Sequence, residues 1–245
     1  MTVRERVLVF DFDGTVSLGD GPVRSYARFV AESLSPADRA NFLDEVDAGL
    51  LGETTLGVNP IDGYDLVRLL SQRHDVSLEN HSRAYDLSRG ELATEHAPVV
   101  APEGLAAFLG TVRESARLVL ATNAPATNIA EALDVLGLDD LFDAVYTSVG
   151  KPLGFETILD ELLEGVPDAA TAMLSIGDVW QNDLEPAYRR GASTALVGPR
   201  ADPAATPTFR ADSLEELYPA LTSWLSSPAS PPHRTTSSSP TLDRR

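Results

Sequence analysis

Short apolar runs alternate with amphipathic stretches along much of the chain. The apolar runs are typical of strands buried on both faces of a parallel sheet, and they occupy residues 7–10, 117–121, 144–147, 172–176 and 194–197. The other stretches repeat apolar residues at helical spacing, over residues 102–114, 126–136, 155–164, 183–190 and 213–224. Strands that alternate with helices predict an α/β fold with a Rossmann-like, doubly wound parallel sheet.

A long helical segment interrupts this alternation after the first strand. Over a hundred residues separate the first two apolar runs, far more than one crossover needs. Amphipathic patterns predict helices over residues 22–34, 36–50, 61–73 and 78–96. We therefore expect a helical cap at residues 18–97, inserted into an α/β core formed by residues 1–17 and 98–226. Residues 227–245 are rich in Ser and Pro and poor in apolar residues, which predicts a disordered tail.

Two aspartates, Asp11 and Asp13, follow the first apolar run directly. Ligands of open α/β sheets bind at the carboxyl ends of the strands. Two carboxylates held close together repel each other, and a hard cation such as Mg²⁺ would relieve that repulsion. The alternative is an ordinary turn, because Asp and the following Gly14 both favour turns.

Two further segments carry groups suited to an anion. Thr122 and Asn123 follow the second apolar run, where a hydroxyl and backbone N–H groups can hold phosphate oxygens, although both residue types also begin helices routinely. Lys151 is the sole lysine of a chain whose other basic residues are all arginine. Its compact ammonium group can lie between a carboxylate and a phosphoryl group.

Two more aspartates, Asp178 and Asp183, follow the fourth apolar run. Their carboxylates suit Mg²⁺. Asp183 is also typical of the acidic residues that favour a helix N-terminus, and both roles can hold together.

These pieces, in this order, resemble the haloacid dehalogenase (HAD) superfamily over residues 6–226, and specifically a phosphatase with a helical cap of the first type. The resemblance implies that Asp11 is a nucleophile and Asp13 a general acid and base. It implies that Thr122, Asn123 and Lys151 hold phosphate. It also implies that Mg²⁺ is held by Asp11, Asp13 through its backbone carbonyl, and Asp178, with Asp183 holding a metal-bound water or positioning Lys151.

The expected activity is therefore Mg²⁺-dependent hydrolysis of small phosphate monoesters through an aspartyl-phosphate. Dehalogenases of the superfamily lack a carboxylate at the position of Asp13, which argues against cleavage of a carbon–halogen bond. A phosphomutase and a non-catalytic phosphate-binding protein stay open as alternatives. In the superfamily the cap recognises the leaving group, for which residues 52–63, Arg24, Arg28 and Trp180 are candidates.

The composition limits the classes of binding partner that we expect. A net charge of −18 argues against nucleic acid, because a backbone binder needs a basic face. The sequence contains no cysteine and no apolar run long enough to cross a bilayer. Because the first predicted strand begins close to Met1, we expect no signal peptide before it. We expect a cytoplasmic monomer or homodimer that acts on a small phosphorylated metabolite and binds neither nucleic acid nor membrane.

Overall fold

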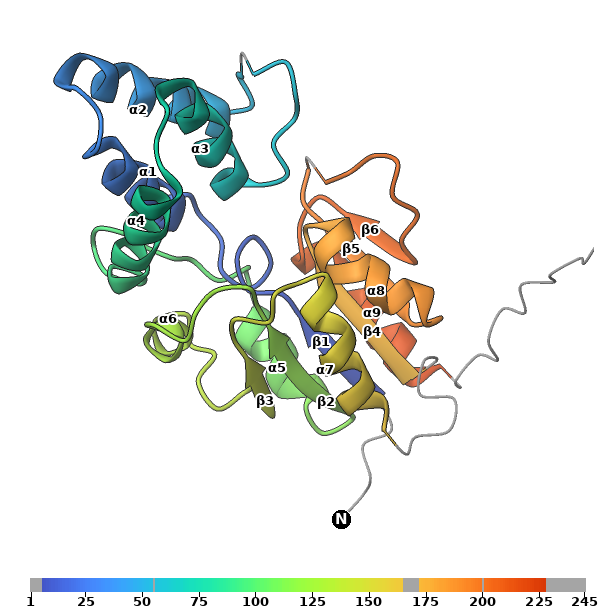
Figure 1. Ribbon diagram of the computed structural model, residues 1–245. Helices are drawn as coiled ribbons and strands as arrows, with labels where there is room; N and C mark the ends of the chain where they lie inside the picture. Colours follow the sequence, from blue (N-terminus) through green and yellow to red (C-terminus); the bar gives the residue numbers. More distant parts are fainter. Residues whose placement is uncertain (1–5, 55, 165–171, 200, 228–245) are drawn as a thin grey trace, which may run out of the picture.

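The computed structural model describes residues 6–54, 56–164, 172–199 and 201–227. Six parallel strands form one sheet in the order β3-β2-β1-β4-β5-β6, with helices on both faces (Figure 1). The strands are β1 (Arg6–Phe10), β2 (Ala116–Ala121), β3 (Ala144–Tyr146), β4 (Met173–Gly177), β5 (Ser193–Val197) and β6 (Phe209–Ala211). The predicted Rossmann-like α/β fold is confirmed.

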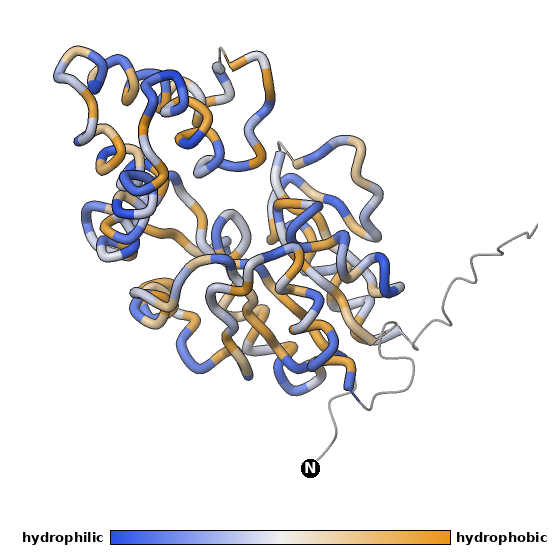
Figure 2. The backbone as a smooth tube through the Cα atoms, viewed as in Figure 1, coloured by the Kyte–Doolittle hydropathy of each residue, from blue (hydrophilic) through white to orange (hydrophobic). Residues whose placement is uncertain are grey.

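Helices cover the two faces of this sheet. On one face, β1 and β2 pack against α5 (Leu105–Val112), α6 (Ile129–Val135) and α9 (Tyr218–Ser226). On the other face they pack against α7 (Leu153–Leu163) and α8 (Glu185–Arg189). The central strands are mostly apolar, as expected of strands buried on both faces (Figure 2).

The remaining helices form a separate layer over the carboxyl ends of the strands. They are α1 (Gly21–Ala31), α2 (Pro36–Leu50), α3 (Gly63–Ser71) and α4 (Leu78–Gly90), and they share their own hydrophobic cluster. Ser35, Asp62 and Ser77 begin α2, α3 and α4, and each side chain accepts a hydrogen bond from the backbone N–H three residues later. We call this layer the cap and the sheet with its flanking helices the core.

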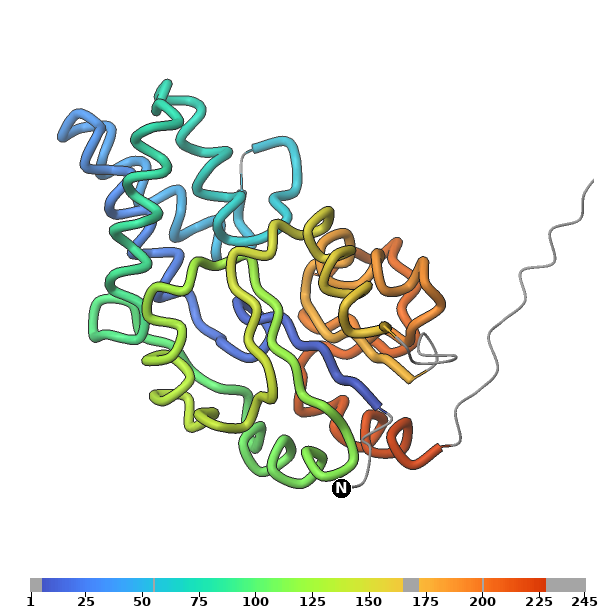
Figure 3. The backbone as a smooth tube through the Cα atoms, turned by 60° about the horizontal axis from the view of Figure 1, so that its bottom comes forward, coloured from blue at the N-terminus to red at the C-terminus, as the bar shows by residue number. Residues whose placement is uncertain are grey.

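Two linkers join the cap to the core and lie side by side (Figure 3). Leu18 and Val100 exchange backbone hydrogen bonds of 2.8 and 3.1 Å. Gly21 approaches the second linker so closely that a Cβ there would lie 2.3 Å from the Pro98 carbonyl oxygen. The two connections are thus bound together at the point where the chain enters and leaves the cap.

Three sequence predictions need correction. The helix expected over 78–96 ends at Gly90, because Ala93 has a positive φ of 64° and Leu92 turns back to pack in the core. The helix expected from residue 183 begins as a π-helical turn at Trp180–Leu184. The strand at 194–197 is followed by β6, which is three residues long and too short to show an alternating pattern.

Within the described residues, no helix is long and apolar enough to span a membrane. The predicted tail is residues 227–245, and all of it except Ser227 lies outside the described part of the chain.

Candidate active site

Asp11 and Asp13 lie where the central strand β1 leaves the sheet. The backbone N–H of Asp11 still donates to the Ile176 carbonyl of β4 at 2.9 Å, so its position is fixed by the sheet. Gly14 then turns the chain with a φ of 84°. A Cβ at Gly14 would lie 2.4 Å from Asp178 Oδ2, so the turn needs glycine both for its conformation and for this close approach.

Lys151 connects two of the predicted carboxylates. Its Nζ donates to Asp11 Oδ1 at 2.5 Å and to Asp183 Oδ1 at 2.6 Å. Burial disfavours the ammonium charge, but the two carboxylates outweigh it and raise the pKa of Lys151. The other oxygen of Asp183 accepts from the Val179 N–H at 2.9 Å. With both oxygens engaged, Asp183 is placed to orient Lys151.

Thr122 and Asn123 lie at the end of β2, next to β1. Thr122 is buried, and its Oγ1 accepts a hydrogen bond of 3.0 Å from the Ala124 N–H. The Asn123 side chain accepts a hydrogen bond of 2.6 Å from the backbone N–H of Lys151 and donates one of 3.4 Å to the backbone carbonyl of Lys151. Asn123 therefore fixes the loop that carries Lys151, a role beyond the phosphate contact expected of its backbone.

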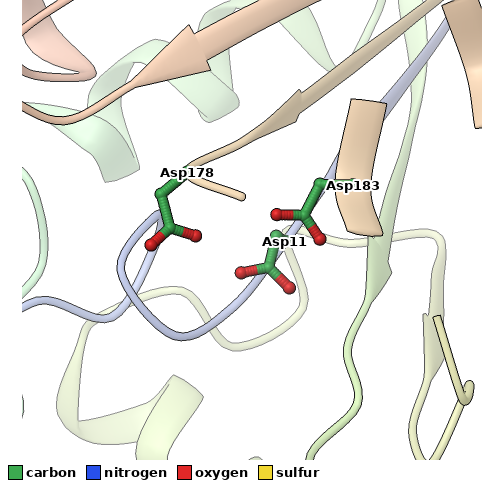
Figure 4. A group of neighbouring side chains, drawn as sticks. All are labelled: Asp11, Asp178 and Asp183. Atoms are coloured by element: carbon green, nitrogen blue, oxygen red, sulfur yellow. The ribbon is translucent and has the colours of Figure 1, made fainter. Parts of the chain in front are cut away.

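Three carboxylates, those of Asp11, Asp178 and Asp183, converge at this edge of the sheet (Figure 4). An oxygen atom from each lies within 4.8 Å of the others. Burial and the neighbouring charge of Asp183 raise the pKa of Asp11 to about 7, and burial with the charge of Asp11 raises the pKa of Asp178 well above its usual range. A hard divalent cation would remove this conflict, so the residues fit Mg²⁺. The Asp13 carboxylate does not belong to this group.

Arg89 was missed by the sequence analysis. It lies in the last turn of α4, its side chain is 1% exposed, and its Nη1 is 3.5 Å from Asp13 Oδ1 and 3.2 Å from the Tyr64 hydroxyl. Its Nε and Nη2 are buried without a hydrogen-bond partner among the described residues. Burial raises the pKa of Asp13, and the charge of Arg89 opposes that rise. The cap thus contributes a buried cation beside a core carboxylate.

A cavity of about 870 Å³ lies between the cap and the carboxyl ends of the strands. All seven predicted site residues line it, namely Asp11, Asp13, Thr122, Asn123, Lys151, Asp178 and Asp183.

The cap candidates for leaving-group recognition divide into two groups. Several members of 52–63 line the cavity, including Thr54, Asn59 and Asp62. Arg24 and Arg28 do not line the cavity. Arg24 forms an ion pair with Asp47 of α2, and Arg28 forms one with Glu91, which follows α4 in the linker from the cap back to the core.

Trp180 is also absent from the cavity lining. It packs against Tyr188 with ring centroids 5.4 Å apart.

Solved structures of proteins that are named for different activities have a similar fold. The magnesium-bound YfnB of Bacillus subtilis is 21% identical, with a TM-score of 0.59, and the match covers 89% of this chain and 99% of that one. The L-2-haloacid dehalogenase RSc1362 is 19% identical, with a TM-score of 0.56 and coverages of 89% and 98%. A predicted phosphoglycolate phosphatase from Haemophilus somnus is 14% identical, with a TM-score of 0.62 and coverages of 90% and 100%. These likenesses establish the fold.

Family membership rests on the sequence. No curated protein sequence matches the chain. The profile of the haloacid dehalogenase-like hydrolases matches residues 5–187, which include all seven predicted site residues. The chain belongs to the haloacid dehalogenase-like hydrolase family.

Proposed function

We propose that this hydrolase cleaves small phosphate monoesters through a phosphorylated Asp11, with Mg²⁺ as its cofactor. The observation that carries the proposal is the position of Asp13. A second carboxylate lies on the same turn as Asp11, inside the same cavity, where a leaving alcohol would need a proton. A carbon–halogen bond needs no such proton, since halide leaves as a stable anion.

In the first step, an oxygen of the Asp11 carboxylate attacks phosphorus. The bond between phosphorus and the ester oxygen breaks, and the leaving oxygen takes a proton from Asp13. The raised pKa of Asp13 favours the protonated form that this step requires. Lys151 and Thr122 line the same cavity as Asp11, and their ammonium and hydroxyl groups are suited to stabilise charge on the phosphoryl oxygens.

In the second step, water attacks the phosphorus of the aspartyl-phosphate. Asp13, now ionised, accepts a proton from that water. The acyl–phosphate bond breaks, inorganic phosphate leaves, and the Asp11 carboxylate is restored.

Asp11, Asp178 and the Asp13 carbonyl are the groups that would hold Mg²⁺, with Asp183 adjacent. When bound, the ion supplies positive charge that permits a dianionic phosphate to approach the carboxylates. Lys151 alone offers a single charge, already shared between Asp11 and Asp183. This excess of negative charge supports a requirement for the metal.

The test is release of inorganic phosphate from a panel of phosphate monoesters, with chelator and with Mg²⁺ restored. The proposal expects multiple turnovers that need Mg²⁺. A phosphomutase would instead move phosphate within or between sugar phosphates with little net release. Binding of phosphate esters without turnover would indicate a non-catalytic protein.

A further inference from the structure

The alcohol half of the substrate must occupy the part of the cavity that the cap encloses. That part mixes aliphatic side chains such as Leu50 and Ile61 with two half-buried tyrosines, Tyr64 and Tyr85. The tyrosine rings meet edge to face, with centroids 5.8 Å apart. Asp62, at the start of α3, adds a carboxylate.

The sign of the charge in this region is negative. Asp62 lines the same cavity as the core carboxylates Asp13 and Asp178. Asp20, at the start of the cap, adds another carboxylate to the lining.

Positive charge is nearly absent from the same surface. Among the described lining residues, Lys151 is the sole basic side chain, and its ammonium is shared between Asp11 and Asp183. Arg89 does not line the cavity, since its side chain is 1% exposed and is directed to Asp13 and Tyr64. Among the lining residues that the structure describes, a second anionic group on the substrate would therefore meet carboxylates and, apart from Lys151, no cation.

We propose, on the basis of the function proposed above, that the cap selects phosphate monoesters whose alcohol carries an ammonium group over those whose alcohol carries a second anion. Asp62 supplies the charge that attracts the ammonium group, and the rings of Tyr64 and Tyr85 supply aromatic surface that favours a cation. The same carboxylate repels a second anion, so one residue contributes both to attraction and to exclusion. For esters of uncharged alcohols, we expect kcat/KM values between those of the two charged classes.

The test uses three esters of similar size that differ in charge: 2-aminoethyl phosphate, 2-hydroxyethyl phosphate and phosphoglycolate. Their kcat/KM values are measured with Mg²⁺ at neutral pH and low ionic strength. One charge interaction in a partly buried site corresponds to about tenfold or more, so we expect the amino ester to exceed the carboxylate ester by at least that factor. Added salt is expected to reduce the ratio.

Asp62→Asn tests the residue itself. Asparagine caps helices as well as aspartate does, so α3 keeps its N-cap while the charge is lost. We expect the ratio of amino to carboxylate ester to fall about tenfold. Asp38→Asn is the matched control, because Asp38 lies exposed in the first turn of α2, is hydrogen-bonded to Ser35 and does not line the cavity. This control is expected to leave the ratio unchanged.

Tyr85→Leu provides a second variant that does not alter the capping of α3. It is expected to lower kcat/KM for the amino ester more than for the hydroxyl ester. A wild-type preference for phosphoglycolate would overturn this inference, and so would an unchanged ratio of amino to carboxylate ester in Asp62→Asn. In either case, hydrolysis of the three esters would still support the proposed function. Failure to hydrolyse any ester, including an aryl phosphate, would overturn both.

Discussion

The Arg89 guanidinium on the cap lies 3.5 Å from the Asp13 carboxylate on the core, across 76 residues of sequence. Asp13 is 28% exposed toward the cavity, whereas Arg89 is almost fully buried. Because a buried charge needs a partner, this contact gives the Arg89 guanidinium a counter-charge through Nη1 and restrains the Asp13 carboxyl group. The cap thereby reaches the residue that we propose as the general acid.

Replacing Arg89 tests this relationship. Arg89→Met is expected to lower kcat about tenfold or more for alkyl phosphates, because Asp13 loses the group that positions it. In an Asp13→Asn background the same change should have little further effect, since residues that act together are not additive. Arg28→Met, which removes an exposed cap arginine paired with Glu91, serves as the control. Additive losses in the double variant would show that Arg89 does not act through Asp13.

Asp13 itself is tested by the leaving group. Asp13→Asn is expected to slow hydrolysis of an alkyl phosphate by about two orders of magnitude or more, because an alkoxide needs a proton. With a nitrophenyl phosphate, the rate of phosphoenzyme formation should fall much less. Pre-steady-state release of nitrophenolate measures that rate directly. Equal losses in that step for both leaving groups would exclude Asp13 as the acid.

Lys151 is expected to act through its position as well as its charge. Lys151→Met leaves Asp11 and Asp183 without the ammonium group between them, so the pKa of Asp11 should rise further. Because Asp11 must be ionised to attack, the acidic limb of the kcat/KM profile should move to higher pH and kcat should fall about a hundredfold. Lys151→Arg should restore little, since a planar guanidinium does not fit where a compact ammonium bridges two carboxylates. Activity of Lys151→Met within a few-fold of wild type would contradict this role.

Asp178 is expected to stabilise the metal complex at the expense of the metal-free protein. Its folded pKa is raised, so the folded state binds a proton more tightly than the unfolded chain does, and stability is lost as pH rises through that range. Asp178→Asn should therefore raise the Tm of the chelated protein at pH 8 by a few degrees, equivalent to about 1 kcal/mol or more, with little gain near pH 4. Mg²⁺ should raise the Tm of wild type but not of this variant. A lower Tm for the chelated variant at pH 8 would show that Asp178 has a structural role instead.

The sequence predicts where the carboxyl ends of the strands bring polar side chains together, because Asp11, Thr122 and Asp178 each follow an apolar run. β1, β2 and β4 are neighbours in a parallel sheet, so groups at their carboxyl ends must meet, and Asp11, Thr122 and Asp178 do so. Arg89 follows no such rule. It lies on an amphipathic helix among other arginines, and its burial depends on how the cap is placed over Asp13, which no local pattern records. No local pattern predicts the surroundings of Arg24 and Arg28 either, which form ion pairs with Asp47 and Glu91.

Phosphorylation of Asp11 is the central claim, and rapid acid quenching tests it most directly. Enzyme mixed with ³²P-labelled substrate and Mg²⁺ should retain label during turnover, and borohydride reduction should mark residue 11 in the peptide map. Asp13→Asn, in which attack by water is slowed, should retain more label than wild type with an aryl phosphate. Asp11→Asn should retain none while keeping its fold by circular dichroism. Label on another residue, or turnover that persists in Asp11→Asn near the wild-type rate, would contradict the account.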